Sequence, residues 1–232
     1  MDPKNLHHWK KTTGERSLEF ALKRLKKERP TATILDYQRD NLDKALSLVK
    51  SRRRALDGGA NFGIMSWHLS QCFNHVVAWE IDPDIRDCLT LNMKNFGCHN
   101  VTIESCGLGQ KEAQVGLVRH AKTFANYVNP DQIKGNLPIR AIDSYGFDDV
   151  DFIKLDCEGY EALILEGGKK TISRCRPVIL MEQKTSSVEC QSGQPLSLLH
   201  TEMWMEKIQS SQEWSAPLRF FVVGMQVWDL AL

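Results

Sequence analysis

The amino-acid sequence predicts an α/β fold around a mostly parallel sheet. Short apolar runs that suit buried strands recur between residues 54 and 182, and segments with the periodicity of amphipathic helices lie between them. Such alternation is typical of βαβ units, in which each helix returns the chain across the sheet. A length of 232 residues with 42% hydrophobic residues suits one sizeable domain with a small appendage.

The appendage is expected at the N-terminus, where residues 1–53 are predicted to form a basic helical cap on a main domain of residues 54–232. Residues 1–13 show no periodicity and are expected to be poorly ordered. Leucines spaced four and then three residues apart predict an amphipathic helix over residues 15–27. Leu42, Ala45, Leu46 and Val49 predict a second helix of the same kind, which ends near residues 52–54.

The main domain is expected to alternate strands and helices. Each strand is short and apolar, and Pro83 suits the first turn of a helix. The expected strands cover residues 54–57, 75–80, 101–106, 113–118, 150–155 and 177–182, and the expected helices cover residues 63–72, 83–96 and 159–166.

Two segments of the main domain are expected to form a substrate lid. Residues 120–138 are polar and contain Asn, Pro and Gly, and residues 183–217 have a mixed composition. The chain then offers two further strand candidates, Arg219–Val223 and Met225–Trp228, on either side of a glycine. We expect them to form a terminal antiparallel hairpin.

Composition limits the class of protein. No apolar run approaches the length of a membrane span, and the N-terminus lacks the apolar stretch of a signal peptide. The seven cysteines are scattered, odd in number and without a C-x-x-C pair, which indicates a reduced, cytoplasmic chain without a structural zinc site.

Charge is unevenly distributed along the chain. Residues 1–56 carry 15 Lys and Arg against 7 Asp and Glu, whereas residues 57–232 carry 15 against 22. Such a basic arm either docks on its own acidic domain, which we favour, or binds an acidic partner such as nucleic acid or an anionic glycan.

A glycine-rich turn follows the first expected strand, in the run Asp57–Gly63. A carboxylate ahead of such a turn would repel phosphate, and it suits a positively charged ligand such as S-adenosylmethionine. Glu80 ends the second strand, where a carboxylate accepts the hydroxyls of a ribose. The expected cofactor-binding residues lie at strand ends and in the turn: Asp57, Gly58, Gly59, Ala60, Asn61, Gly63, Glu80, Ile81, Ser105 and Asp156.

The reaction centre is expected in the run Asp151–Glu161. Strand alternation places Lys154 and Asp156 on one face, with Asp156 at the carboxyl end of the strand. Methyl transfer to an alcohol needs a proton acceptor, so we predict Asp156 as general base, with Glu158 at the start of the next helix. Lys154 would keep these carboxylates ionised, act on the substrate, or serve only as a structural ion-pair partner.

Two alternatives concern the same segment. Asp156, Glu158 and Glu182 offer hard oxygen ligands for a divalent cation, but we favour a site without metal. Cys157 is expected to be a buried core thiol and not a nucleophile.

This set of motifs resembles the FkbM family of methyltransferases over about residues 54–184. The motifs occur in the order Asp57–Gly63, Ala78-Trp79-Glu80, Asn92-x-x-Asn95, Asp151–Glu161, Leu165-x-Gly167-Gly168 and Arg176–Glu182. The resemblance implies a Rossmann-like class I methyltransferase fold and S-adenosylmethionine as cofactor. It also implies O-methylation of sugars or other hydroxylated acceptors.

By match to the family pattern, Asp57, Gly59, Asn61, Gly63 and Glu80 would line the cofactor site. Asp156 and Glu158 would lie at the reaction centre.

The sequence departs from the family pattern in two places. Trp79 stands where the family often has Phe, and the tail after Glu182 matches no pattern. We expect the tail and the 120–138 segment to determine the choice of acceptor.

Three other functions are weaker interpretations of the sequence. A nucleic-acid methyltransferase would use the basic arm, but the amine-methylation motif and a Pro-Cys pair are missing. Two residues argue against a nicotinamide-dependent oxidoreductase. Asp57 precedes the turn, and Ala60 occupies the position of the second glycine in the dinucleotide-binding motif G-x-G-x-x-G. A non-catalytic binding module would not need Asp156 and Glu158. The expected partner is therefore a small-molecule or glycan acceptor.

Overall fold

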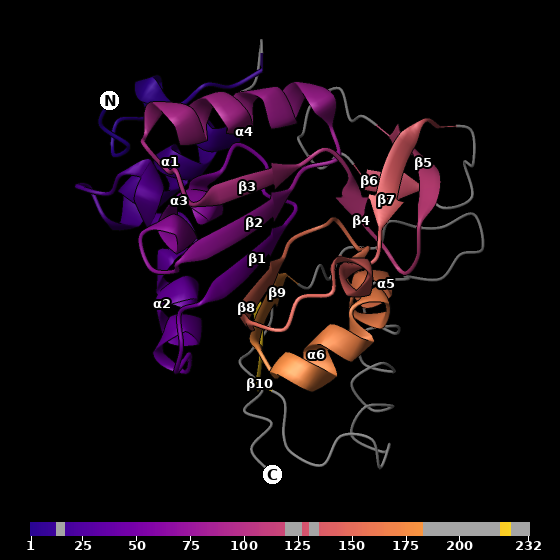
Figure 1. Ribbon diagram of the computed structural model, residues 1–232. Helices are drawn as coiled ribbons and strands as arrows, with labels where there is room; N and C mark the ends of the chain where they lie inside the picture. Colours follow the sequence, from indigo (N-terminus) through magenta and orange to yellow (C-terminus); the bar gives the residue numbers. More distant parts are fainter. Residues whose placement is uncertain (13–16, 119–126, 130–134, 183–218, 224–232) are drawn as a thin grey trace, which may run out of the picture.

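The computed structural model describes residues 1–12, 17–118, 127–129, 135–182 and 219–223 (Figure 1). In this part of the chain, six strands form one sheet in the order β10-β9-β8-β1-β2-β3, and every neighbouring pair is parallel. The strands are β1 (Arg54–Gly58), β2 (His75–Trp79), β3 (Val101–Glu104), β8 (Val150–Leu155), β9 (Val178–Glu182) and β10 (Arg219–Val223). The predicted mostly parallel sheet is confirmed.

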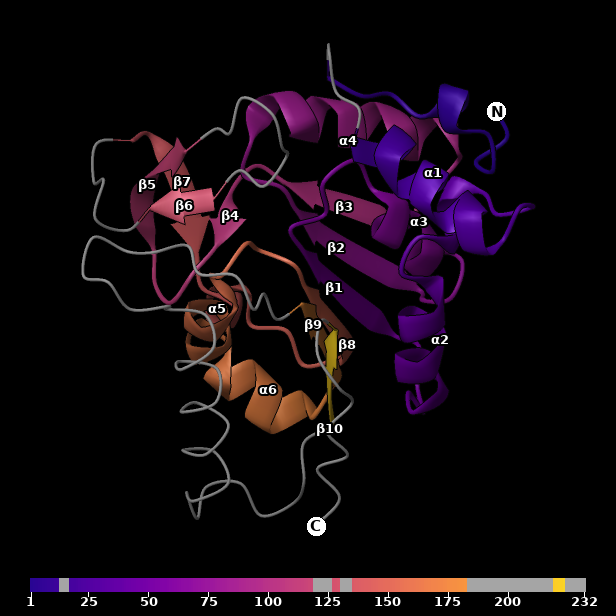
Figure 2. The same cartoon turned by 180° about the vertical axis from the view of Figure 1, so that it is seen from behind.

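Helices cover both faces of this sheet (Figures 1 and 2). Alternation along β1 shows how: Ala55 packs with helices α2 and α3, while Leu56 packs with η3, α5 and α6 on the opposite face. The helices of the first face are α1 (Ser17–Glu28), η2 (Ile34–Asp36), α2 (Arg39–Ser47), α3 (Ile64–Ser70) and α4 (Pro83–Asn95). Those of the second face are η3 (Ile142–Tyr145), α5 (Glu161–Gly167) and α6 (Lys169–Cys175).

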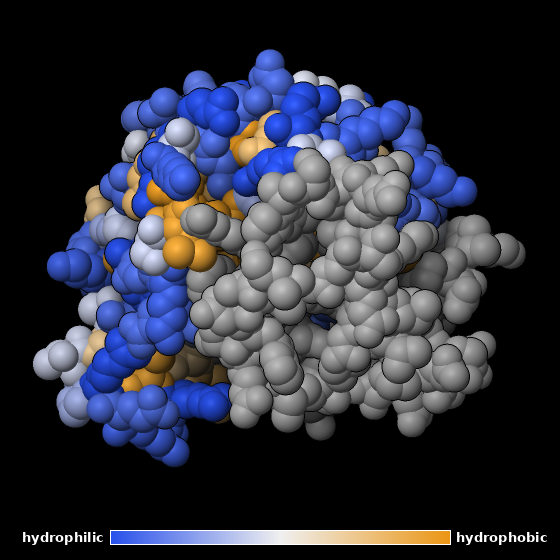
Figure 3. Space-filling model, turned by 90° about the horizontal axis from the view of Figure 1, so that it is seen from below, coloured by the Kyte–Doolittle hydropathy of each residue, from blue (hydrophilic) through white to orange (hydrophobic). Residues whose placement is uncertain are grey.

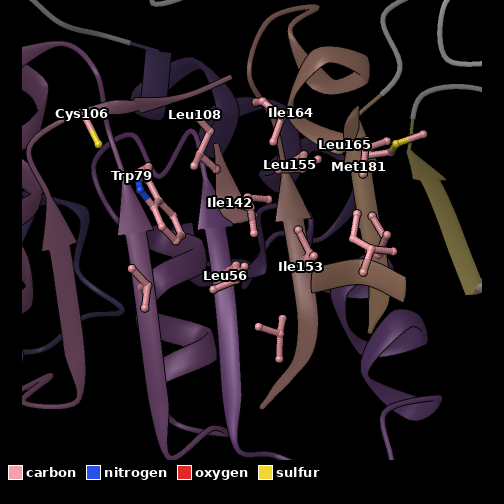
Figure 4. Packing of buried hydrophobic residues seen from close by; sticks show 14 residues of the cluster. Leu56, Trp79, Cys106, Leu108, Ile142, Ile153, Leu155, Ile164, Leu165 and Met181 are labelled. Atoms are coloured by element: carbon pink, nitrogen blue, oxygen red, sulfur yellow. The ribbon is translucent and has the colours of Figure 1, made fainter. Parts of the chain in front are cut away.

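The core of the second face is a continuous apolar cluster (Figure 4). Leu56, Ile153 and Trp79 enter it from the strands, and Ile142 and Ile164 enter from η3 and α5. All five side chains are at most 1% exposed. Full burial of aliphatic side chains of this size is worth about 1.5–3 kcal/mol each, so this cluster fixes the strands that carry the site.

The first twelve residues correct an expectation, because they are ordered. A short helical turn, η1 (Leu6–His8), leads to Trp9, which is 3% exposed and lies 4.7 Å from Phe96 between ring centroids. The buried side-chain amide of Asn92 donates to the carbonyls of Lys10 and Phe62. The segment is therefore held against α4.

A second, smaller sheet has the order β4-β7-β5-β6 within the described residues. Its strands are β4 (Gly107–Leu108), β5 (Ala113–Val118), β6 (Tyr127–Asn129) and β7 (Leu137–Arg140). The segment predicted as a lid at 120–138 thus contains β6 and the start of β7. The other expected lid, 183–217, lies outside the described residues.

The expected terminal hairpin is described only in its first strand. That strand is β10, and it pairs parallel with β9. The second strand, Met225–Trp228, lies outside the described residues.

Part of the basic N-terminal charge pairs with the acidic domain. Arg53 contacts Asp151 at 2.6 Å and Arg54 contacts Asp149 at 2.7 Å. Seen from below, the described surface is mainly hydrophilic, with small hydrophobic areas (Figure 3). None of the described helices has the length and hydrophobicity needed to cross a bilayer.

Candidate active site

A pocket opens at the carboxyl ends of the central strands, where parallel sheets of this kind bind ligands. The glycine turn after β1, the residues that follow β2 and the loop between β8 and α5 contribute its walls. The lining residues are Gly59, Asn61, Trp79, Glu80, Ile81, Ile85, Gly107, Leu108, Asp156, Cys157, Glu158 and Tyr160.

Two glycines allow the turn after β1 to take its path. Gly59 has φ +70°, and a Cβ there would lie 1.9 Å from the backbone oxygen of Asp156. Gly63 has φ +96°, and its Cβ would meet Leu89 and Met93 of α4 at 2.6 and 2.7 Å. The turn therefore touches the end of β8 on one side and α4 on the other, which only glycine permits.

Glu80 lies at the pocket with an oriented carboxylate. Its Oε2 accepts a hydrogen bond from the backbone N–H of Asn61, and its Oε1 accepts one from that of Asp82, both at 2.9 Å. Burial raises the pKa of Glu80 to about 7, although both amides favour the charged form. Each oxygen keeps a lone pair, so the group can accept two further hydroxyl donors.

The structure places Asp57 differently from the prediction. Its side chain is 0% exposed and is not part of the pocket wall. Oδ2 accepts a hydrogen bond of 2.6 Å from Ser66, and Oδ1 lies 3.0 Å from Nζ of Lys154. Asp57 and Lys154 thus form a buried ion pair. Asp57 thus faces the interior, so a charged ligand in the pocket would not meet it.

Lys154 is an ion-pair partner inside the protein, which is one of the roles expected for it. Its Nζ donates to the carbonyls of Gly59 at 2.7 Å and Gly58 at 3.2 Å, and it pairs with Asp57. Burial alone would lower the pKa of Lys154, but the charges of Asp57 and Asp156 outweigh burial and raise it. Nζ thus contacts the end of β1 and the turn after it, so Lys154 lies behind the turn and is not among the residues that line the pocket.

The loop from β8 to α5 brings Asp156, Cys157 and Glu158 to the pocket. The backbone N–H of Asp156 donates to the carbonyl of Gly58 at 3.1 Å, which fixes the loop to the end of β1. Cys157 is half-buried: it lines the pocket and also packs against the apolar cluster of the second face. Burial raises the pKa of its thiol well above the usual value, which keeps it protonated and unreactive.

The pocket gathers about half of the residues that the sequence predicts for the site. Those in its wall are Gly59, Asn61, Glu80, Ile81, Asp156 and Glu158. Those behind or away from the wall are Asp57, Gly58, Ala60, Gly63, Ser105 and Lys154. Among the described His, Cys, Asp and Glu residues, no group of three is placed to hold a metal ion.

Sequence reasoning missed part of the wall. Gly107 follows β3, and a Cβ there would lie 2.9 Å from Ile81, so its small size is the available signal. Tyr160 lies inside the run Asp151–Glu161, where an aromatic residue beside carboxylates is a usable signal. The other missed lining residues are Trp79, Ile85, Leu108 and Cys157.

A polar network holds the indole ring of Trp79, which is part of the pocket wall. Its Nε1 donates to the hydroxyl of Tyr145 at 3.0 Å, and that hydroxyl donates to Glu104 at 3.2 Å. The two rings meet edge to face at 5.4 Å between centroids. A phenylalanine at position 79 could not make the first bond, so this network depends on the tryptophan.

Solved structures provide three comparisons. An FkbM methyltransferase from Methylobacillus flagellatus KT is 21% identical, with 67% of this chain and 37% of that chain covered and a TM-score of 0.47. A precorrin-6y C5,15-methyltransferase from Geobacter metallireducens GS-15 is 16% identical, covering 76% and 71%, with a TM-score of 0.44. An rRNA methylase from Streptococcus thermophilus is 10% identical, covering 74% and 77%, with a TM-score of 0.44.

These three TM-scores lie below 0.5, so the assignment of the chain rests on its sequence family. This chain spans little more than a third of the length of the Methylobacillus protein. No curated protein matches the chain. The family model described as the methyltransferase FkbM domain matches residues 57–209, which is more than half of the chain. The chain therefore belongs to the FkbM family of S-adenosylmethionine-dependent methyltransferases.

Proposed function

We propose that this chain transfers a methyl group from S-adenosylmethionine to a hydroxyl group of a sugar or of another hydroxylated acceptor. The observation that carries the proposal is the shared wall of one pocket. Glu80, Asp156, Glu158 and Tyr160 all line it, although they come from two segments of the chain. The carboxylate that we assign to the ribose and the carboxylate that we assign as base thus line the same pocket.

The residues of the pocket fit the cofactor. Glu80 would accept the two ribose hydroxyls, because its backbone bonds already orient both oxygens. Since Asp57 is buried, the positive charge of the cofactor would face Asp156 and Glu158. Among the described residues of the wall there is no Lys or Arg to repel it. When bound, S-adenosylmethionine supplies the methyl group.

Asp156 is the residue we assign to the proton of the acceptor. An alcohol is a poor nucleophile at neutral pH, and a carboxylate within hydrogen-bond reach of its proton typically contributes about 10²–10⁴-fold to the rate. The bond from Asp156 N to Gly58 fixes the base relative to the cofactor turn. Holding the hydroxyl in line contributes through proximity.

Tyr160 and the carboxylates favour a sugar as acceptor. Carboxylates accept hydrogen bonds from hydroxyls, and an aromatic ring supplies an apolar surface for the ring carbons. The same carboxylates would repel a phosphate backbone, and two arginines of the basic arm are paired with the acidic domain. These observations favour a sugar over nucleic acid.

The test is a screen with labelled methyl donor against glycans, nucleosides and nucleic acids. We expect label on a hydroxyl of a glycan or related acceptor. Asp156→Asn should lower kcat by about 10²–10⁴-fold and change the dissociation constant for the cofactor by less than about threefold. Asp148→Asn is the matched control, because Asp148 is exposed just before β8, at the opposite end of the same strand.

Two outcomes would contradict the proposal. Full activity of the Asp156→Asn enzyme would remove Asp156 as the base. Label on nucleic acid alone, with none on any hydroxylated small molecule, would replace the proposed acceptor class.

A further inference from the structure

Glu161 is a buried carboxylate that the proposed chemistry does not use. It begins α5, directly after the loop that carries Asp156 and Glu158, and it is only 6% exposed. Its Oε1 accepts a hydrogen bond of 2.7 Å from the backbone N–H of Cys157. Burial raises the pKa of Glu161, and the backbone amides of Cys157, Gly159 and Glu161 itself oppose that rise by binding the charged form.

The loop around this carboxylate has a disfavoured backbone. Glu158 has φ +56° and Gly159 has φ +97°, so two successive residues lie in the left-handed region. This conformation is uncommon for a residue with a Cβ, and it needs support from its surroundings. Successive backbone amides in a turn can bind an anion. Here the amides of Cys157, Gly159 and Glu161 favour the charged form of the Glu161 side chain.

The loop is also fixed at its other end. The amide of Asp156 donates to Gly58 at 3.1 Å, and the amide of Tyr160 donates to the carbonyl of Cys157 at 3.2 Å. The segment 156–160 therefore lies between the end of β1 and the carboxylate of Glu161. Removing that carboxylate would leave the partly buried amide of Cys157 without its acceptor.

We infer that Glu161 is a positioning residue for methyl transfer, which holds residues 156–160 so that Asp156 and Glu158 lie at the pocket. Glu161 is not among the lining residues, so it acts through the loop and not on the acceptor. The inference rests on the proposed function, because that function gives Asp156 its part as base.

The first test is kinetic. Glu161→Met removes the acceptor, and displacement of a base by about 1 Å lowers the rate on the order of 100-fold, so we expect kcat to fall by about 30–100-fold. Glu161→Gln keeps one oxygen that can accept from the amide of Cys157, so kcat should fall less in this variant than in Glu161→Met. Cofactor affinity should stay within about threefold, because Glu80 and the β1 turn are unchanged.

The control is Glu166→Gln on the same helix. Glu166 forms a half-buried ion pair of 3.1 Å with Lys169, outside the pocket wall. The Glu166→Gln variant should keep the kcat of the parent enzyme. A fall in kcat for Glu166→Gln equal to that for Glu161→Met would overturn the assignment, since the effect would then belong to the helix as a whole.

The second test is amide hydrogen exchange, which needs no acceptor. In Glu161→Met, exchange should accelerate at least about tenfold over residues 157–160 and stay unchanged in β1 and β8. If the parent protein transferred no methyl group, the proposed function would be contradicted. The exchange measurement would still test whether Glu161 holds the loop.

Two results would overturn the inference itself. One is parent-like exchange over residues 157–160 in Glu161→Met. The other is faster exchange with parent-like kcat, which would make Glu161 a structural residue only.

Discussion

Oδ1 of Asp57 lies 3.0 Å from Nζ of Lys154, and the two residues are register partners on the neighbouring parallel strands β1 and β8. Both side chains are buried, with 0% and 6% exposed. This pair holds the two strand ends that carry the cofactor turn and the reaction-centre loop. The negative charge of Asp57, for which the sequence pattern predicts a cationic ligand, is thus neutralised by Lys154 inside the protein.

Removing one partner of this pair should destabilise the protein strongly. Lys154→Met leaves the Asp57 carboxylate buried without a cation, which typically costs about 3–5 kcal/mol in the free energy of unfolding. Asp57→Asn should also be costly, because it leaves the Lys154 ammonium unpaired. The loss in the free energy of unfolding of the double variant should be about 1–3 kcal/mol smaller than the sum of the losses of the two single variants. Urea unfolding of all four proteins measures this coupling, and strictly additive losses would show that the two charges do not act as a pair.

Cofactor affinity should depend on pH through Glu80. Burial raises the pKa of this carboxyl to about 7, so roughly nine tenths of it is protonated at pH 6 in the free protein. The charged form accepts both ribose hydroxyls, so the dissociation constant for the cofactor should be about tenfold higher at pH 6 than at pH 8. Glu80→Gln should bind more weakly and show little of this dependence. An equal pH dependence in Glu80→Gln would assign the titration to another group.

Stability should fall in mild acid because of His68. Its Nε2 donates to the carbonyl of Leu35 at 2.8 Å, and its Nδ1 accepts from Arg39 at 3.0 Å, so the ring is held neutral. Burial lowers the pKa of His68 to about 4 from 6.5. The unfolded chain therefore binds the proton first, and stability is lost as pH falls from about 6.5 to 4.

The size of this loss follows from the shift in pKa, at about 3 kcal/mol for the full transition. The measurement compares the free energy of unfolding at pH 7 and pH 5 for the parent protein and for His68→Gln. The parent should lose more stability than the variant. Equal losses in the two proteins would contradict a buried neutral ring.

Much of the fold and half of the pocket wall follow from local sequence. Short segments with apolar residues, lying between helical segments, predict β1, β2, β8 and β9, because buried parallel strands need apolar side chains. The place of Glu80 follows from the same pattern, since the carboxyl ends of parallel strands meet at one edge.

Other features depend on contacts between distant residues. Which way Asp57 points is decided by its register with Lys154, and that register requires the strand order, which local sequence does not give. Trp9 is ordered because Phe96, far along the chain, packs on it. Strand β7 contains Pro138, which argues against a strand in isolation and is tolerated here beside Gln114 of β5.

The most direct test of the account is calorimetry of the parent protein and of Glu80→Ala with S-adenosylmethionine and with NAD. We predict that the parent binds S-adenosylmethionine and not NAD. Glu80→Ala should bind it on the order of 10–100-fold more weakly, through loss of charge-assisted hydrogen bonds. Glu112→Ala, at an exposed carboxylate before β5, should bind like the parent. Binding of NAD alone, or unchanged affinity in Glu80→Ala, would contradict the account.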